Sequence, residues 1–417
     1  MNASNGNGDF DLIVVGAGAA GFFGAINFAE FNPGSKIIIL EKSHKLLSKV
    51  RVSGGGRCNV THSCFNPFQL ARHYPRGEKQ LKQLFKEFDA EAMIAWLKDK
   101  DVKLHTEDDG RMFPVSNSSQ TIIDCFLREA AKYSIKIQMG AEVDSITKSN
   151  RLVVSTRDGQ SYISRAILIA IGGNASSDFY EVIRRLGHSV NRPIPSLFTF
   201  NEKQKSYADL MGVAVSDCEV KIEGTRYSQR GPVLITHWGL SGPAVIKLSA
   251  WAAVYLHEQR YKFNVLINWT GDTTEASMKE QLSNLKKDRA KQKVVSRPAI
   301  SVPIRLWERL CVMSEISDDR MWQDLSNRQI NKLTENLIRS RFNIEGKTTF
   351  KEEFVTCGGV PLDEVEVTSM ESKICPGIYF AGEVLDIDGE TGGFNFQAAW
   401  STAYIAAKEI ARNSTST

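Results

Sequence analysis

The amino-acid sequence predicts an α/β protein built on a discontinuous Rossmann-like domain, with a long insert in the middle of the chain. Three observations lead to this prediction. A glycine-rich turn joins a buried strand to a helix near the N-terminus, and a second strand–glycine–helix junction lies near the C-terminus. The stretch between them carries β-like and helical patterns of its own. A chain of 417 residues has room for roughly three domains of about 150 residues each.

The first junction has every part of a dinucleotide-binding unit. The β-branched run Phe10–Val15 is typical of a strand buried on both faces, and it leads directly into GAGAAG, residues 16–21. Gly16 permits a tight turn, Gly18 lets a pyrophosphate approach the backbone, and Gly21 lets the helix and strand pack closely. Ala19 and Ala20 open a helix to about residue 31, whose N-terminus offers N–H groups to phosphates. A dinucleotide is expected to bind here.

The next strand, residues 36–40, ends at Glu41 and Lys42. Glu41 follows the glycines by about twenty residues, the distance at which an acid accepts ribose hydroxyls. Soon afterwards Lys49–Val60 reads KVRVSGGGRCNV. The triplet Gly54, Gly55 and Gly56, followed by Arg57 and Asn59, forms a loop whose backbone can lie against a phosphate or a flat ring.

The second junction favours FAD over NAD. Gly377–Leu385 reads GIYFAGEVL, and a glycine-rich turn then leads into an Ala-rich helix that extends to about residue 412. Glu383, after Gly382, could accept ribityl hydroxyls. The N–H groups of Gly393, Phe394 and Asn395 lie at a helix start, where they would stabilise negative charge on the flavin ring. An FAD domain assembled from both chain ends explains this layout, and a simple NAD domain does not.

These motifs make the chain resemble the bacterial flavoproteins of the aminoacetone-oxidase-like and bile-acid-reductase-like (BaiN/YhiN) family. The resemblance covers nearly the whole chain. It rests on GAGAAG (16–21), SGGGRCNVT (53–61), GRMFP (110–114), AIGG (170–173), THWGLSGPA (236–244), CGGV (357–360) and AGEVLDIDGETGGFNFQAAW (381–400).

The resemblance implies non-covalent FAD and an insert with a β-rich, barrel-like part and a helical part. It places Glu41 at the adenosine ribose, Val143 at the adenine, Gly172 and Gly173 beside the nucleotide, and Glu383 at the ribityl chain. The remaining residues expected at the cofactor are Gly16, Gly18, Ala19, Ala20, Gly21, Lys42, Lys49, Gly54, Gly55, Gly56, Arg57, Asn59, Gly382, Gly393, Phe394 and Asn395.

The expected domain boundaries follow from these motifs and from the pattern between them. The FAD-binding domain takes residues 1–192 and 351–417, and the insert takes 193–350, with a β-rich part at 193–270 and a helical part at 271–350. Pro193 and Pro195 mark the exit from the first domain. Ser326 and Gln329 form a capping-box pattern that predicts a helix over 327–342.

Composition excludes several other classes of protein. The net charge is only +4, and the basic cluster between Lys286 and Lys293 is interrupted by Asp288 and lacks aromatic residues, so no nucleic-acid partner is expected. Seven scattered cysteines without a C-x-x-C pair argue against disulfides and structural zinc, and no metal ligand set is apparent. No apolar run approaches the roughly 18 residues of a membrane helix. The Asn/Gly-rich start, Met1–Asp9, is expected to be a short disordered leader, and a cytoplasmic location is expected.

The reaction itself leaves fewer traces. His237 could move a proton near the flavin or simply anchor its own turn, and both interpretations remain open. Cys58 is better explained as a packed thiol than as a redox group. Because only one GxGxxG occurs between a strand and a helix, the flavin is reduced directly by its substrate or by NAD(P)H docking transiently.

We therefore expect an FAD-dependent oxidoreductase that transfers hydride at flavin N5 on a small molecule. Family likeness allows either amine oxidation or reduction of an enone-type carbon–carbon bond. An FAD-dependent tRNA-modifying protein and a flavin-binding protein without turnover are the alternatives.

Overall fold

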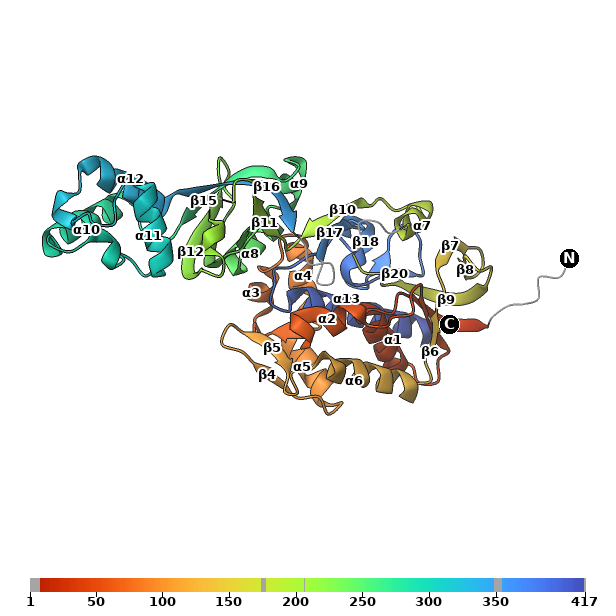
Figure 1. Cartoon of the computed structure of the whole chain (residues 1–417). Coiled ribbons are helices and arrows are strands. Elements are labelled where there is room, and N and C mark those ends of the chain that lie inside the picture. The colour runs from red at the N-terminus through yellow and green to blue at the C-terminus, as the bar shows by residue number, and fades with distance from the viewer. Residues whose placement is uncertain (1–7, 174–177, 206, 349–354, 416–417) are drawn as a thin grey trace. The chain divides into compact units, whose positions relative to one another are not determined.

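The computed structural model describes residues 8–173, 178–205, 207–348 and 355–415. Most of the predicted leader and the predicted boundary at 350/351 lie outside these ranges. The chain forms two compact units, Met1–Ser196 with Lys351–Thr417, and Leu197–Phe350. In Figure 1 the first unit combines red to yellow segments from the start of the chain with blue segments from its end.

The centre of the first unit is a parallel sheet with the strand order β20–β9–β1–β2–β6. These strands are β1 (Asp9–Val15), β2 (Ile37–Glu41), β6 (Lys136–Met139), β9 (Ser161–Ile169) and β20 (Ile378–Phe380). The antiparallel additions are β7 (Val143–Lys148), β8 (Leu152–Thr156), β18 (Val365–Glu366) and β19 (Glu371–Ser372). Residues 12–15 of β1 are buried because neighbouring strands pair with both edges and helices cover the sheet.

Helices α1 (Ala19–Phe31) and α13 (Phe394–Thr415) pack along each other, although they come from opposite ends of the chain. The ring of Phe23 on α1 lies 5.3 Å from that of Trp400 on α13, 6.2 Å from that of Phe126 and 4.8 Å from that of Trp96. The last two rings belong to α6 (Ser119–Lys132) and α5 (Ala90–Lys98). This aromatic cluster joins the two ends of the chain in one core, which stabilises the discontinuous domain.

Shorter elements complete this unit. They are α2 (Ser48–Gly56), β3 (Thr61–His62), α3 (Pro67–Ala71), α4 (Glu78–Leu84), β4 (Leu104–Thr106), β5 (Arg111–Pro114), α7 (Phe179–Arg185), β10 (Asn191–Ser196), β17 (Val355–Gly359), η4 (Leu362–Glu364) and η5 (Gly382–Val384). Strand β10 runs across the predicted boundary at 192/193. It pairs with β17, and this pairing keeps it in the first unit.

The second unit contains a closed barrel with the strand order β11–β14–β13–β12–β15–β16. The strands are β11 (Thr199–Glu202), β12 (Ala214–Ile222), β13 (Ser228–Ile235), β14 (Gly239–Ser241), β15 (Lys262–Asn268) and β16 (Ser340–Thr348). The helices are η1 (Ala208–Leu210), α8 (Pro243–Trp251), α9 (Ala253–Glu258), α10 (Glu275–Asp288), η2 (Val294–Ser296), α11 (Ile304–Met313), η3 (Trp322–Asp324) and α12 (Asn327–Ile338).

The division of the insert at residue 270 was wrong for its last segment. The capping box at Ser326 is present, but α12 ends at Ile338, and the chain then enters β16, which closes the barrel against β11 and β15. Phe342, expected on the helix, is buried with its ring 6.1 Å from that of Trp269 and 4.6 Å from that of Tyr207. Burial alternates from Ser340 to Ile344, a period of two that suits a strand and not a helix.

Candidate functional site

The predicted cofactor residues gather at the carboxyl edge of the parallel sheet. Gly16 follows β1, Glu41 is the last residue of β2, Gly172 and Gly173 follow β9, and Gly382 follows β20. Because these strands are parallel, their carboxyl ends meet at one edge, where open α/β sheets bind their ligands. Four separate stretches of sequence therefore reach a single site.

The glycines of the first junction have different surroundings. A Cβ on Gly21 would lie 1.9 Å from the Gly16 carbonyl oxygen, so only glycine allows this contact between turn and helix. A Cβ on Gly18 would meet nothing within 4 Å, and the backbone there has an ordinary φ of −89°. Gly18 therefore borders open space at the N-terminus of α1. The first turn of α1 has no acidic residue and no side-chain cap, so its N–H groups and dipole are suited to an anion.

Glu41, the last residue of β2, holds the turn between β1 and α1 in place. Its two carboxylate oxygens accept hydrogen bonds from the Ala17 and Ser43 N–H groups, each at 2.9 Å. Each oxygen has a second lone pair, so the carboxylate retains capacity for ribose hydroxyls. Lys42 beside it is exposed, and Val143 is buried at the start of β7, where it pairs with Thr156.

The glycine triplet makes a left-handed turn at the end of α2. Gly54, Gly55 and Gly56 have φ values of +58°, +69° and +83°, which glycine adopts without steric cost. The guanidinium of Arg57 pairs with Glu107 at 2.6 Å and lies 4.0 Å above the Phe113 ring. The structure thus shows Arg57 bracing its own loop.

Two neighbours of Arg57 hold the loop from inside. Cys58 is fully buried, and burial raises the pKa of its thiol to about 12, which fits a packed thiol. Asn59 accepts from the Gly393 N–H at 3.0 Å and donates to the Thr61 carbonyl at 3.0 Å, the amide orientation that satisfies both groups. Asn59 therefore joins the glycine loop to the second glycine-rich junction.

Glu383 connects three of the segments. Its carboxylate forms an ion pair with Lys49 and accepts from the Gly173 N–H at 3.0 Å. Next to it, the hydroxyl of Thr356 is fully buried and has no hydrogen-bond partner among the described residues. A buried hydroxyl without a partner is uncommon, and a polar ligand beside Glu383 would satisfy it.

The start of α13 differs in detail from the sequence prediction. The Gly393 N–H is bonded to Asn59, and the Asn395 side chain bonds the Gly389 N–H and carbonyl at 2.8 and 3.0 Å. Asn395 thus braces the preceding loop with its side chain. The first-turn N–H groups of Phe394 and Asn395 have no acceptor within the helix, and they remain suited to a flavin carbonyl.

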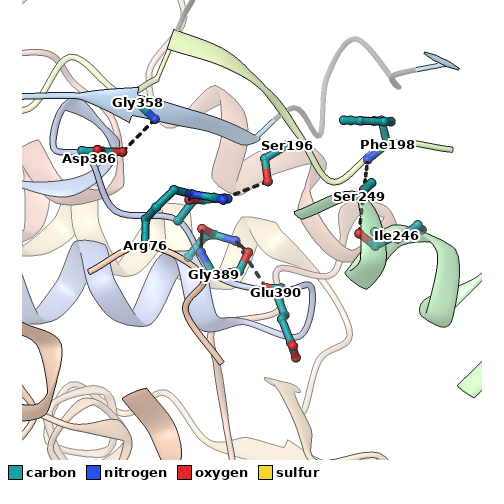
Figure 2. Close-up of polar contacts among 11 residues, drawn as sticks. Arg76, Ser196, Phe198, Ile246, Ser249, Gly358, Asp386, Gly389 and Glu390 are labelled. Atoms are coloured by element: carbon teal, nitrogen blue, oxygen red, sulfur yellow. Dashed lines mark hydrogen bonds and ion pairs between the residues drawn. The ribbon is translucent and has the colours of Figure 1, made fainter. Parts of the chain in front are cut away.

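Sequence reasoning missed a set of charged residues that face this loop. Arg76 forms an ion pair with the fully buried Asp388, whose carboxylate also accepts from the Ser196 hydroxyl at 2.7 Å. Figure 2 labels Arg76 and Ser196. His73 Nδ1 lies 3.0 Å from Glu390 Oε2. The motif DIDGETGGFN contains both acids, but nothing in the sequence showed that residues 73–76 are their partners.

His237 lies in the second unit, on the turn between β13 and β14. Its side chain is exposed, and its ring lies 4.3 Å from that of Trp238 in an edge-to-face contact. Thr236 and Gly239 close the turn through backbone and hydroxyl hydrogen bonds, so the turn is held without His237. A role of His237 in chemistry stays a prediction.

The predicted cofactor residues at the carboxyl edge of the sheet form a cradle, and the features of this cradle fit FAD. It offers open space at Gly18 and Gly172, an anion-binding helix start, an acid at the end of β2, and a buried hydroxyl beside Glu383 without a partner in the described chain. Among the described residues, no three His, Cys, Asp or Glu side chains are grouped as metal ligands. The fold and site define a flavin-dependent oxidoreductase with a Rossmann-type FAD domain.

The chain belongs to the HI0933-like family. The model of the HI0933-like protein Rossmann domain matches residues 10–409, nearly the whole chain. This family includes the BaiN-like and YhiN-type proteins that the sequence motifs resemble.

Relatives with named activities match over nearly their full length. A ribosomal RNA dihydrouridine synthase of Escherichia coli is 30% identical over 96% of this chain and 98% of its own. A protein of the same name from Haemophilus influenzae is 27% identical, with 96% and 98% covered. A 3-dehydro-bile acid delta(4,6)-reductase of Clostridium scindens is 26% identical, with 95% and 98% covered.

Solved structures support the fold. A 3-ketosteroid-delta4-(5alpha)-dehydrogenase of Rhodococcus jostii has a TM-score of 0.54 at 12% identity, with 98% of each chain covered. A 3-ketosteroid delta1-dehydrogenase of Sterolibacterium denitrificans has a TM-score of 0.52 at 12% identity, covering 97% of this chain and 100% of its own. Across the described ranges, no helix is long and apolar enough to span a bilayer.

Proposed function

We propose that this protein reduces a carbon–carbon double bond conjugated to a carbonyl group in a small organic molecule, with FAD as the hydride carrier and NAD(P)H as the reductant. The proposal rests on one observation: the names of the relatives describe the same kind of reaction, reduction of a carbon–carbon double bond conjugated to a carbonyl group. Dihydrouridine differs from uridine by two hydrogens across a bond conjugated to a ring carbonyl. A delta(4,6) bond system in a 3-dehydro bile acid is likewise conjugated to its ketone.

The residues of the FAD-binding unit support this chemistry. The first turn of α1 would hold the pyrophosphate, Glu41 the adenosine ribose, and Glu383 with Lys49 the ribityl chain. The start of α13 would place a positive dipole end at the flavin ring. FAD, when bound, supplies a hydride at N5 for the carbon β to the carbonyl.

A second candidate substrate is a uracil base in ribosomal RNA. Two relatives with that activity in their names match the chain from end to end, and they count against the expectation that no nucleic acid is a partner. The basic cluster of the helical part is partly available, because Lys287, Lys291 and Lys293 are exposed. Lys286 instead donates to the Leu325 carbonyl at 2.5 Å, which removes it from any such surface.

The test is an anaerobic reaction of the purified, FAD-loaded protein. NADPH or NADH is added until the oxidised-flavin absorbance is lost, and the reduced protein is then mixed with a 3-oxo-Δ4 steroid or with an unmodified ribosomal RNA transcript. In a separate reaction, the oxidised protein is mixed with a panel of small amines. Flavin reoxidation by the steroid, with a product heavier by two hydrogens, is the expected result. Reoxidation by RNA alone would select the second candidate. Flavin bleaching by an amine, with neither of the other reactions, would overturn the proposal in favour of amine oxidation.

A further inference from the structure

A stretch after α3 lies antiparallel to the loop that precedes α13. Arg76 and Asp388 form an isolated antiparallel bridge, and the Glu390 N–H donates to the His73 carbonyl at 2.8 Å. The Tyr74 hydroxyl, which is buried, donates to the Phe394 carbonyl at 2.6 Å. These bonds fix residues 73–76 against the segment that leads to the predicted flavin edge.

Within this pairing, the His73 side chain is oriented by a carboxylate. Its Nδ1 lies 3.0 Å from Glu390 Oε2, and the Glu390 side chain is only 8% exposed. The His73 side chain is 33% exposed, and its Nε2 has no hydrogen-bond partner in the described part of the chain. One ring nitrogen is therefore held by an acid while the other is available. An acid–base histidine needs this arrangement.

The ring of His73 is also fixed in plane. It stacks on Phe394 with centroids 4.2 Å apart and an interplanar angle of 12°, and His62 stacks on the same ring at 4.7 Å and 21°. Phe394 is the first residue of α13, directly after Gly393. The imidazole thus lies beside the helix start that we assign to the flavin ring. Figure 2 shows that the Glu390 side chain points away from Arg76.

We propose that His73 is the proton donor to the substrate, with Glu390 as its positioning residue. This inference rests on the proposed function, because reduction of a conjugated double bond adds a hydride to the β carbon and a proton to the α carbon. The protonated imidazole gives its Nε2 proton to the α carbon, and the hydride and its electron pair come from the reduced flavin. Neutral His73 keeps the proton on Nδ1, which donates a hydrogen bond to the Glu390 carboxylate, and Nε2 regains its proton from solvent. NAD(P)H supplies the two electrons.

A purely structural role for the pair predicts a different set of effects. In that case, losing His73 would loosen the loop before α13 and would weaken FAD binding and flavin reduction by NAD(P)H together. A proton donor acts only after the flavin is reduced. The two half-reactions therefore separate the two roles.

The main experiment compares His73→Gln with the wild type by stopped-flow spectroscopy on the FAD-loaded protein. The probe is whichever of the steroid and the RNA transcript reoxidises the wild-type flavin. We expect flavin reduction by NAD(P)H and FAD affinity to be unchanged in H73Q, and flavin reoxidation by the probe to slow by roughly 10²-fold or more. Glu390→Gln should slow the same step less, and added imidazole should restore part of the rate in His73→Gly. His257→Gln, which removes a histidine of the second unit bonded to Tyr261, is the matched control.

A second readout does not depend on turnover. In oxidised, FAD-loaded protein with ¹⁵N-labelled histidine, the saturated product of the probe should shift the imidazole resonance that H73Q lacks. An unchanged rate of flavin reoxidation in H73Q would overturn the role of His73 as proton donor, and so would a parallel loss of both half-reactions and FAD affinity. Either result would leave the proposed function standing. Failure of the wild type with both probes would overturn the proposed function, and the role of His73 would fall with it.

Discussion

At the residue scale, the two glycines of the first turn do different work. Gly21 cannot carry a side chain, because its Cβ would lie 1.9 Å from the Gly16 carbonyl oxygen. A Cβ on Gly18 would meet no atom within 4 Å beyond its chain neighbours, and the φ of −89° suits any residue. The fold therefore does not require glycine at position 18, whereas the pyrophosphate that we propose beside it would.

Replacing Gly18 with leucine should abolish FAD binding and leave the protein folded. The side chain would fill the space proposed for the pyrophosphate, and the loss of a glycine N-cap typically costs about 1 kcal/mol. Flavin fluorescence quenching measures the affinity, and thermal unfolding checks the fold. Gly21→Leu is the contrasting variant, which should fail to fold normally. Undiminished FAD affinity in G18L would remove the pyrophosphate from this turn.

The sequence predicted which residues lie near the carboxyl edge of the sheet, but it did not predict the contacts that each of them makes. Gly16, Gly21 and Glu41 could be assigned because the strand–turn–helix spacing fixes their places locally. Arg57, Asn59 and Asn395 have partners 50, 334 and 6 residues away that also hold the loops in place. The pairing of His73 with Glu390 spans 317 residues, a separation over which no sequence pattern reports contact.

At the element scale, sequence patterns predicted helices and strands well where an element is determined by residues close to it in the chain. The strand–helix–strand unit from β1 to β2 and the capping box of α12 were both predicted correctly. The helix predicted over 327–342 was longer than α12, because the sequence has a strong signal for the start of the helix and no comparable signal for its end. Ser340–Thr348 becomes a strand only because two barrel strands offer it partners.

One buried ion pair, between Arg76 and Asp388, is among the contacts that hold the segment around Arg76 against the loop before α13. Asp388→Asn removes the carboxylate that is ion-paired with the Arg76 guanidinium, a side chain that is only 17% exposed. We expect a loss of stability toward the low end of the roughly 3–5 kcal/mol typical of broken buried pairs, measured by urea unfolding. Glu87→Gln is the control, because it breaks the exposed pair with Lys408, which also reaches α13, and should cost about 0–1 kcal/mol. Equal losses in the two variants would contradict the importance of burial at Asp388.

At the scale of the whole molecule, FAD binding is expected to stabilise one unit selectively. All the cradle residues lie in 1–196 and 351–417, so FAD at about 100 times its Kd should add roughly 2.7 kcal/mol to the stability of that unit. Hydrogen exchange should slow in peptides around the first turn of α1, the glycine triplet and the start of α13. The G18L variant provides the baseline, and protection confined to residues 197–350 would contradict this assignment.

The sequence by itself determined the Rossmann-type unit at the N-terminus, because Gly21 and Glu41 make their contacts within one strand–helix–strand segment. It also showed that both chain ends contribute, since each end carries its own glycine-rich junction. Only the tertiary structure decided that β10 stays with the first unit and that β16 closes the barrel. It alone decided that His73 faces Glu390. The physical reason is the same in each case: these contacts join segments far apart in the chain, and they exist only once the sheet, the barrel and the aromatic core have brought those segments together.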